Sequence, residues 1–248
     1  MSFSSPLFKP PWTLAGRLIE SAIRKALYDF NLVKDTKKVA VALSGGKDSM
    51  TLLMMLAAIS GRGTPPFELL AIHVDGEFSC GAGVNKEYLQ KLCQELNVPF
   101  ITRKSNKTLE ELECYSCSRE RRTLIFNTAK EEGCNTIAFG HHRDDNAQTV
   151  LMNLLHKGEF AGILPKITMR EYGVTIIRPL IYIEEEKITA FAKAQGFMRI
   201  TCRCPVGQKS MRKKTSLLLK EIEDLYPNAV NNLSSASLLY GTDKANRK

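Results

Sequence analysis

Residues 44–49 of this sequence, which read SGGKDS, have the types and spacing of a phosphate-binding loop. They follow a short apolar run and precede a run, Met50 to Ile59, with the composition of a helix. Backbone N–H groups at a helix N-terminus bind phosphate oxygens, and lysine and serine side chains add donors. A carboxylate repels phosphate unless a divalent cation lies between them, so Asp48 indicates Mg²⁺. The expected phosphate-binding residues are Ser44, Gly45, Gly46, Lys47, Asp48 and Ser49.

A second polar segment, GHHRDDNAQT at residues 140–149, follows another apolar run. Polar and acidic side chains at the carboxyl end of a buried strand are poorly placed for a core and well placed for a metal ion or a nucleotide. A histidine in such a loop can simply hydrogen bond to the backbone. We therefore rank the carboxylates Asp144 and Asp145 above the neighbouring histidines as functional residues.

Two pairs of closely spaced cysteines indicate metal or sulfur chemistry. Cys114 and Cys117 have the C-x-x-C spacing that lets two thiolates reach one metal ion or cluster, and a helix expected from Ser118 would stabilise them. Cys202 and Cys204 form the second pair. Four thiolates would satisfy a structural zinc ion, whereas three would leave one coordination site of an iron-sulfur cluster open. The residues alone leave both alternatives open.

The remaining cysteines are isolated in the sequence. The total of seven is odd, and the N-terminus lacks the apolar core of a signal peptide, so we expect no disulfide framework. Cys93 and Cys134 are predicted to be buried small hydrophobic residues, and Cys80 stands alone.

Short apolar runs, which begin 30 to 37 residues apart, predict the elements that position these residues. Helix-like segments lie between the runs, which is the spacing of βαβ units. Continuous apolar strands are typical of a parallel sheet buried on both faces. We expect an α/β fold, an open parallel sheet flanked by helices. The predicted strands are Val39–Leu43, Leu69–Val74, Pro99–Thr102 and Thr136–Gly140.

Helical additions are expected at both ends of this sheet. An amphipathic helix that packs on the following chain is predicted because apolar residues recur at helical spacing. These residues are Leu14, Leu18, Ala22, Ala26 and Phe30. The chain after Ile183 reads mostly as helix. We expect an N-terminal extension at 1–35, an α/β core at 36–182, and a basic helical segment at 183–248.

Composition and charge favour a soluble protein with a polyanionic partner. The 248 residues are 44% hydrophobic and 25% charged, which excludes a disordered chain. The net charge is +9, and residues 187–220 hold nine lysines or arginines and no acidic residue, so this block could neutralise several RNA phosphates. A solvated basic face is the alternative. No window approaches the roughly 20 apolar residues of a membrane span, and we expect a cytoplasmic protein.

The glycine-rich segment, with the preceding Leu43, resembles the pyrophosphate loop of the PP-loop ATPases, whose fold is adenine nucleotide alpha hydrolase-like. The GHHRDD segment resembles that of the tRNA-modifying branch. With the cysteine pattern, the similarity to the tRNA 2-thiocytidine synthetase family extends from about Leu18 to Leu239. In that family, ATP activates a cytidine of the anticodon loop, and a 4Fe-4S cluster held by three cysteines carries sulfide on its open iron.

The resemblance implies a role for each candidate residue. ATP would bind to residues 44–49, Gly140 and His141, with Mg²⁺ near Asp48 and a second contact from Asp144 or Asp145. Cluster ligands would be Cys114, Cys117 and Cys204; Cys204 is preferred to Cys202 by its distance from Arg212 and because related uridine thiolases also have Cys-Pro. The implied partners are tRNA and a sulfur donor such as a cysteine desulfurase, and dimers are common among similar enzymes.

Three rival functions share parts of this pattern. A tRNA uridine thiolase would share the ATP loop and the cysteines. A lysidine-type ligase would share the loop but has no use for the cysteines. A zinc-stapled module that binds ATP and RNA would use all four paired cysteines for structure.

Overall fold

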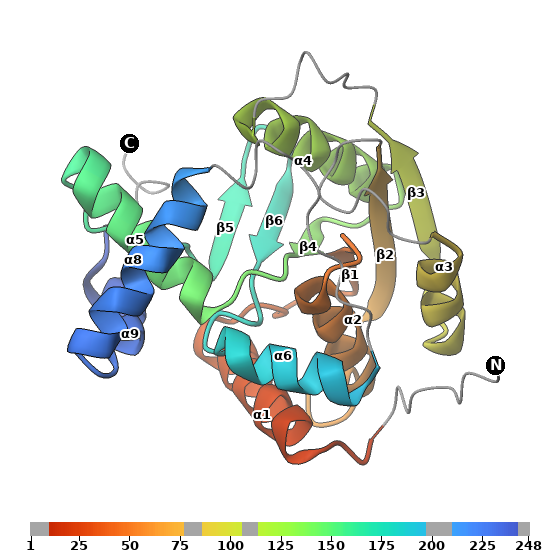
Figure 1. The fold of residues 1–248 in the computed structure, drawn as a ribbon. Helices are drawn as coiled ribbons and strands as arrows, with labels where there is room; N and C mark the ends of the chain where they lie inside the picture. The colour runs from red at the N-terminus through yellow and green to blue at the C-terminus, as the bar shows by residue number, and fades with distance from the viewer. Residues whose placement is uncertain (1–9, 77–85, 106–113, 197–209, 243–248) are drawn as a thin grey trace.

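The computed structural model describes residues 10–76, 86–105, 114–196 and 210–242 (Figure 1). Its centre is a six-stranded sheet with the strand order β3-β2-β1-β4-β6-β5. Five of these strands run parallel, and β5 pairs antiparallel with β6 at one edge. The bounds are β1 Lys38–Ala42, β2 Glu68–Asp75, β3 Phe100–Lys104, β4 Thr136–Ala138, β5 Lys166–Met169 and β6 Val174–Ile177.

All four predicted strands are present, with ends shifted by a few residues, and the predicted fold class is confirmed. The hairpin of β5 and β6 was not predicted. Each of its strands has only four residues, and Lys166 and Thr168 of β5 are not buried. A short edge strand with one solvated face lacks the continuous apolar run that marks a central parallel strand.

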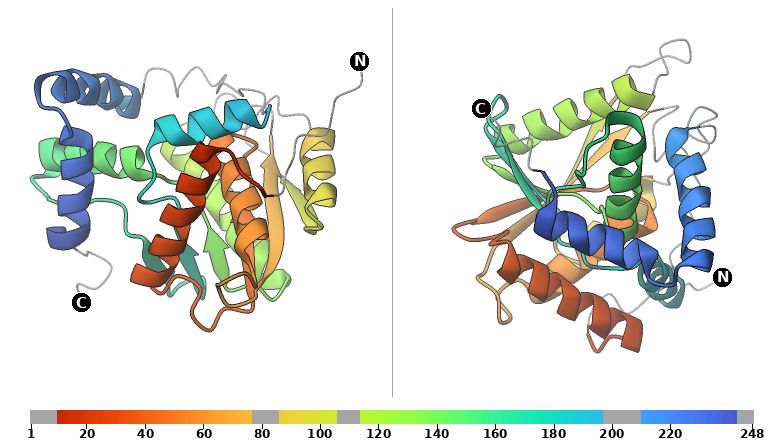
Figure 2. Two further views of the ribbon diagram at one scale, coloured as in Figure 1. Left: turned by 90° about the horizontal axis from the view of Figure 1, so that it is seen from below. Right: turned by 90° about the vertical axis from the view of Figure 1, so that its left-hand side faces the viewer.

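Helices cover both faces of the sheet (Figures 1 and 2). One face packs against α1 Leu14–Asp29, α2 Lys47–Ile59, α3 Lys86–Glu95 and α6 Glu185–Ala194. The other packs against α4 Cys114–Glu131. The helix α2 is buried almost all round, which explains its continuous apolar sequence.

The N-terminal helix is present, and its predicted apolar row is buried only in part: Ala26 is fully buried, and Ala22 and Phe30 are partly buried against the core. Leu14 is 65% exposed and Leu18 is 46% exposed, whereas Ile19 and Ile23 are fully buried. The reason is that α1 packs against α6 and α2 through a face that also includes the neighbouring row with Ile19 and Ile23. Both rows are apolar, so spacing alone cannot tell which one faces the core. At Gly16 an added Cβ would lie 2.7 Å from Trp12 Cβ, so α1 begins in close contact with the preceding chain.

The three remaining helices form a group beyond the sheet, in which α8 Met211–Leu225 and α9 Ala229–Tyr240 pack on α5 Arg143–Lys157 (Figure 2). The interface between α5 and α9 contains the fully buried Asn146. Its Nδ2 donates to Ser234 Oγ and Ser237 Oγ at 2.9 Å each, and its Oδ1 accepts from the Ile163 backbone N–H at 2.6 Å. Among the described residues, no helix is long and apolar enough to span a membrane.

Candidate functional site

The glycine-rich loop connects β1 to α2 at the carboxyl edge of the parallel strands. Gly45 has φ 82°, a left-handed conformation that favours glycine. Gly46 caps α2, and its N–H donates to Ser44 Oγ at 3.3 Å. The Ser44 and Ser49 hydroxyls lie 3.0 Å apart, and Ser49 Oγ also donates to the Gly46 carbonyl at 3.0 Å. The loop thus holds a helix N-terminus and two hydroxyls at the edge where open α/β sheets bind ligands.

The chain after β4 passes directly against this loop. A Cβ on Gly140 would lie 3.1 Å from both the Asp48 carbonyl carbon and the Ser49 nitrogen. Because these atoms are backbone, a side chain at position 140 would push the two segments a few tenths of an ångström apart. The two polar segments that the sequence singled out are therefore in contact.

The side chain of Lys47 forms ion pairs with two carboxylates. Its Nζ lies 2.8 Å from Asp48 Oδ1 and 3.0 Å from Glu185 Oε1 on α6. Burial by itself would lower the pKa of Lys47, but these two carboxylates outweigh it and raise the pKa above its usual range. Lys47 is therefore a cation that compensates Asp48.

His142, which the sequence analysis ranked below the carboxylates, lies at the centre of the acidic residues. It caps α5 and is only 5% exposed. Its Nε2 is 3.5 Å from Asp145 Oδ2 and 4.0 Å from Asp48 Oδ1, and its Nδ1 is 3.7 Å from Asp144 Oδ2. Burial opposes protonation, but the three carboxylates outweigh it and raise the pKa of His142. The available sequence signal was its position at the start of a helix, just before the acidic pair Asp144 and Asp145.

The two aspartates after His142 also stabilise the local backbone. Asp145 Oδ2 accepts from the His142 backbone N–H at 3.1 Å. Asp144 Oδ2 accepts from the Glu185 N–H at 3.0 Å, which connects α5 to the first turn of α6. Burial would raise the pKa of Asp144, but His142 and these hydrogen bonds lower it below its usual range. Its carboxylate is therefore ionised at neutral pH.

A cavity of about 420 Å³ opens beside these residues, between α5, α6 and α8. Half of the residues that line it are acidic, including Asp48, Asp144, Asp145 and Glu185. Within the described ranges, no group of three or more His, Cys, Asp or Glu residues is arranged to bind a metal by itself. This donor set still fits Mg²⁺, which binds proteins through one or two carboxylates and takes its other oxygens from phosphate and water.

The first cysteine pair occupies the N-terminus of α4. This helix begins at Cys114, earlier than the predicted Ser118, so Cys114 and Cys117 both belong to its first turn. The Cys117 side chain is half-buried. The hydroxyl of Ser105, just after β3, donates to Glu120 Oε2 on α4 at 2.9 Å. The cysteine pair is thereby held at the same carboxyl edge of the sheet as the glycine-rich loop.

The other cysteines divide into two groups. Cys93 and Cys134 are fully buried, as predicted, and burial raises the pKa of the Cys93 thiol to about 12, so neither is a reactive thiolate. Cys80, Cys202 and Cys204 lie outside the described residues.

The fold and the loop define a PP-loop domain, and the model of the family described as "PP-loop domain" matches residues 17–200. The chain belongs to this family and, more narrowly, to the family of proteins named tRNA-cytidine(32) 2-sulfurtransferase. The relative from Geobacter metallireducens is 34% identical over 84% of this chain and 83% of its own length. The relative from Anaeromyxobacter dehalogenans is 36% identical over 89% of this chain and 78% of its own length.

Solved structures confirm the fold. The U34-tRNA thiolase NcsA from Methanococcus maripaludis, solved with its [4Fe-4S] cluster, matches with a TM-score of 0.74 at 24% identity over 94% of this chain and 82% of that chain. The NMN synthetase from Francisella tularensis matches with a TM-score of 0.51 at 11% identity over 91% of this chain and 95% of that chain.

Proposed function

We propose that this chain is an ATP-dependent tRNA sulfurtransferase that replaces the 2-oxygen of an anticodon-loop cytidine with sulfur. Membership of the 2-sulfurtransferase family supports the substrate and the reaction. One observation carries the proposal: a phosphate loop after β1 and a cysteine pair at the start of α4 lie at the same edge of one sheet.

ATP is proposed to bind with its phosphates on residues 44–49 and against the close turn at Gly140 and His141. Mg²⁺ would be held between the phosphates and Asp48, with Asp144 or Asp145 as a further contact. Lys47 would then move from Asp48 to a phosphate oxygen, since its flexible ammonium can exchange one anion for another.

Cys114, Cys117 and Cys204 are proposed to hold a 4Fe-4S cluster. The first two fit this role because the N-terminal end of a helix stabilises thiolates and the spacing lets both reach one group. A cluster with three thiolate ligands and one open iron would supply sulfide at the end of the sheet where ATP binds.

The reaction proceeds in two displacements. The 2-oxygen of the base attacks the α-phosphorus of ATP and releases pyrophosphate, which leaves the base adenylated. Sulfide then attacks carbon 2, and the carbon–oxygen bond breaks with loss of AMP. ATP is required because the oxygen of a base carbonyl is a poor leaving group until it is part of a phosphate ester.

The remaining partners are also proposals. The basic block at residues 187–220 would bind tRNA, although Lys187 and Arg212 already contact Glu184 and Asp145. A cysteine desulfurase or another persulfide donor would resupply sulfur, the chain would work in the cytoplasm, and a homodimer is the proposed assembly. Residues 1–35, 36–182 and 183–248 are proposed to serve as N-terminal support, catalytic core and RNA-binding segment.

Mass spectrometry of tRNA nucleosides from cells that lack the protein tests this function. Loss of 2-thiocytidine, restored by the wild-type gene, is the expected result. Loss of 2-thiouridine instead would assign the chain to the uridine thiolases. Unchanged thionucleosides, with one zinc ion per anaerobically purified chain, would identify a zinc-stapled binding module.

A further inference from the structure

Two side chains that follow β4 and β6 each have one buried nitrogen atom without a hydrogen-bond partner among the described residues. The strands are neighbours in the sheet, and the Phe139 N–H donates to the Ile177 carbonyl at 2.9 Å, so the residues that follow them lie side by side. His141 Nδ1 and Arg178 Nε are both buried, and neither atom has a hydrogen-bond partner among the described residues. A buried polar atom left without a partner destabilises the fold, which points to a ligand that completes the site.

Arg178 is held in place without being neutralised by a carboxylate contact. Its Nη1 donates to the Leu164 carbonyl at 2.5 Å, and it forms no ion pair within the described ranges. Burial is the main cause that lowers the pKa of Arg178 to about 10. The positive charge of Arg122 also lowers it, whereas the negative charge of Asp145 raises it. The free Nε–H belongs to the fork with which arginine binds two phosphate oxygens.

The surroundings of His141 are cationic. Burial, together with the charges of Arg178, Arg212 and Arg122, lowers the pKa of His141 to about 3, although Asp145 acts in the opposite direction. Arg122 comes from α4 and Arg212 from the start of α8, whose backbone carbonyl at Arg212 accepts from Gln148 Nε2 on α5 at 2.7 Å. Charges from three separate elements therefore disfavour protonation of this imidazole.

We propose that Arg178, with Arg122 and Arg212, forms a phosphate-binding subsite that is separate from the glycine-rich loop and adjoins the proposed ATP site at His141. The subsite deepens the proposed function and rests on it. Its ligand is a phosphate oxyanion, either a phosphodiester of the tRNA next to the target base or a phosphate of the nucleotide. The tRNA is favoured because α2 already offers its N-terminus to ATP, whereas Arg122 and Arg212 come from the cysteine-bearing helix and the basic helix.

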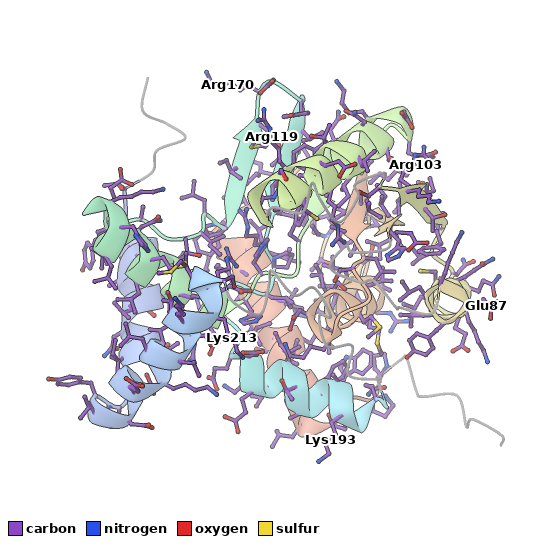
Figure 3. All side chains as sticks on the ribbon, turned by 45° about the horizontal axis from the view of Figure 1, so that its top comes forward. Glu87, Arg103, Arg119, Arg170, Lys193 and Lys213 are labelled. Atoms are coloured by element: carbon purple, nitrogen blue, oxygen red, sulfur yellow. The ribbon has the colours of Figure 1, made fainter. Side chains whose placement is uncertain are left out.

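The test uses Arg178→Gln and Arg178→Lys in the full chain, with Arg170→Gln as the matched control. Arg170 is exposed at the turn between β5 and β6, away from the site (Figure 3). Three quantities are measured: thermal unfolding, the Kd of a non-hydrolysable ATP analogue, and the Kd of an unmodified tRNA transcript over a series of salt concentrations.

In Arg178→Gln we expect the tRNA Kd to rise about tenfold, because a charged hydrogen bond is lost. The slope of log Kd against log salt should fall by about 1, since one phosphate contact disappears. Arg178→Lys should retain the slope but lose part of the affinity, because lysine lacks the fork. Arg170→Gln should bind as wild type. A weaker ATP analogue with unchanged tRNA binding would support the subsite and assign its phosphate to the nucleotide.

The subsite would be overturned if folded Arg178→Gln bound both ligands as wild type, or if Arg170→Gln lost as much affinity. Should Arg178→Gln fail to fold, wild-type affinities in Arg178→Lys would overturn it in the same way. Absence of thionucleoside formation by the wild-type protein would overturn the function and leave the subsite standing, because these measurements concern binding alone.

Discussion

At the scale of single residues, the main electrostatic feature of the site is the set of side chains that face the Asp48 carboxylate. Lys47 contacts this carboxylate directly, and His142 approaches it from the side of α5. The ammonium of Lys47 and the imidazole of His142, whose pKa is raised by the neighbouring carboxylates, thus both lie beside Asp48. The proposed Mg²⁺ ion would have to compete with both side chains, which would couple metal binding to movement of Lys47.

Asp48→Ala should abolish ATP-dependent thiolation and leave the fold intact. The Asp48 side chain is 31% exposed and packs in no core, so we expect a stability loss of about 1 kcal/mol or less. Thionucleoside yield and thermal unfolding are the measurements, with the exposed Asp224→Ala on α8 as control. Wild-type turnover of Asp48→Ala at saturating Mg²⁺ would contradict the assignment.

His142 should make part of the stability depend on pH. Its folded-state pKa is raised above the ordinary 6.5, so its stabilising contribution is fully present below pH 6.5 and is lost as the pH rises through the folded value. We therefore expect the difference in unfolding free energy between wild type and His142→Gln to shrink as the pH rises. Urea unfolding in magnesium-free buffer measures it, and a difference that stays constant with pH would refute the charged imidazole.

At the scale of elements, the N-terminus of α4 and the turn after β4 position residues of the proposed site. Cys114 and Cys117 share one helical turn, so their backbones move together with α4. Gly140 presses the turn after β4 onto the first turn of α2. The N-terminus of α4 contributes the cysteine pair, and the turn after β4 packs on the glycine-rich loop. Both lie at the carboxyl edge of the parallel sheet.

Separate alanine variants of the paired cysteines should separate a working cluster from a structural metal. We expect Cys114→Ala, Cys117→Ala and Cys204→Ala each to lose both cluster absorbance and thiolation after reconstitution with iron and sulfide, and Cys202→Ala to retain both. ATP binding should survive in all four variants, because the glycine-rich loop belongs to another turn. Equal loss of stability in Cys202→Ala and Cys204→Ala would favour a closed zinc site.

Gly140→Ala should disturb the contact between the two loops. Its Cβ would meet backbone atoms at 3.1 Å, and overpacking of this kind costs about 1 to 3 kcal/mol. Gly46→Ala is the matched control, because its Cβ would meet only Ser44 Oγ at an ordinary 3.5 Å. Thermal unfolding of both variants is the measurement, and equal stability losses would show that the close approach is unimportant.

At the scale of the whole molecule, the charge is unevenly distributed. The chain carries a net charge of +9, yet the cavity beside Asp48 is lined largely by carboxylates. Exposed lysines gather instead on helices such as α8, where Lys213 lies on the surface (Figure 3). This separation suits an enzyme that attracts a polyanion to its surface while it reserves an acidic cavity for a cation.

Binding of tRNA should weaken steeply with salt, and Lys213 and Lys214 should account for part of that dependence. The double variant Lys213→Gln/Lys214→Gln is expected to reduce the salt slope by about 2, one for each phosphate contact. Arg212 is left unchanged because it contacts Asp145. The control is Lys34→Gln/Lys37→Gln, exposed just before β1 at the opposite edge of the sheet. Equal slopes in both double variants would mean that α8 is only a solvated basic face.

The sequence by itself determined the parallel core and the residues at its carboxyl edge. Four apolar runs with helices between them require a parallel sheet, and such a sheet collects the turns after β1 and β4 at one edge. Local spacing was enough there, because each motif begins directly where a strand ends. The tertiary structure decided what depends on distant packing: which apolar side chains of α1 are buried, the hairpin of β5 and β6, the raised pKa of His142 and the electrostatic effect of Arg178 on His141. Burial and charge at those positions come from residues far apart in the chain, and no local pattern records them.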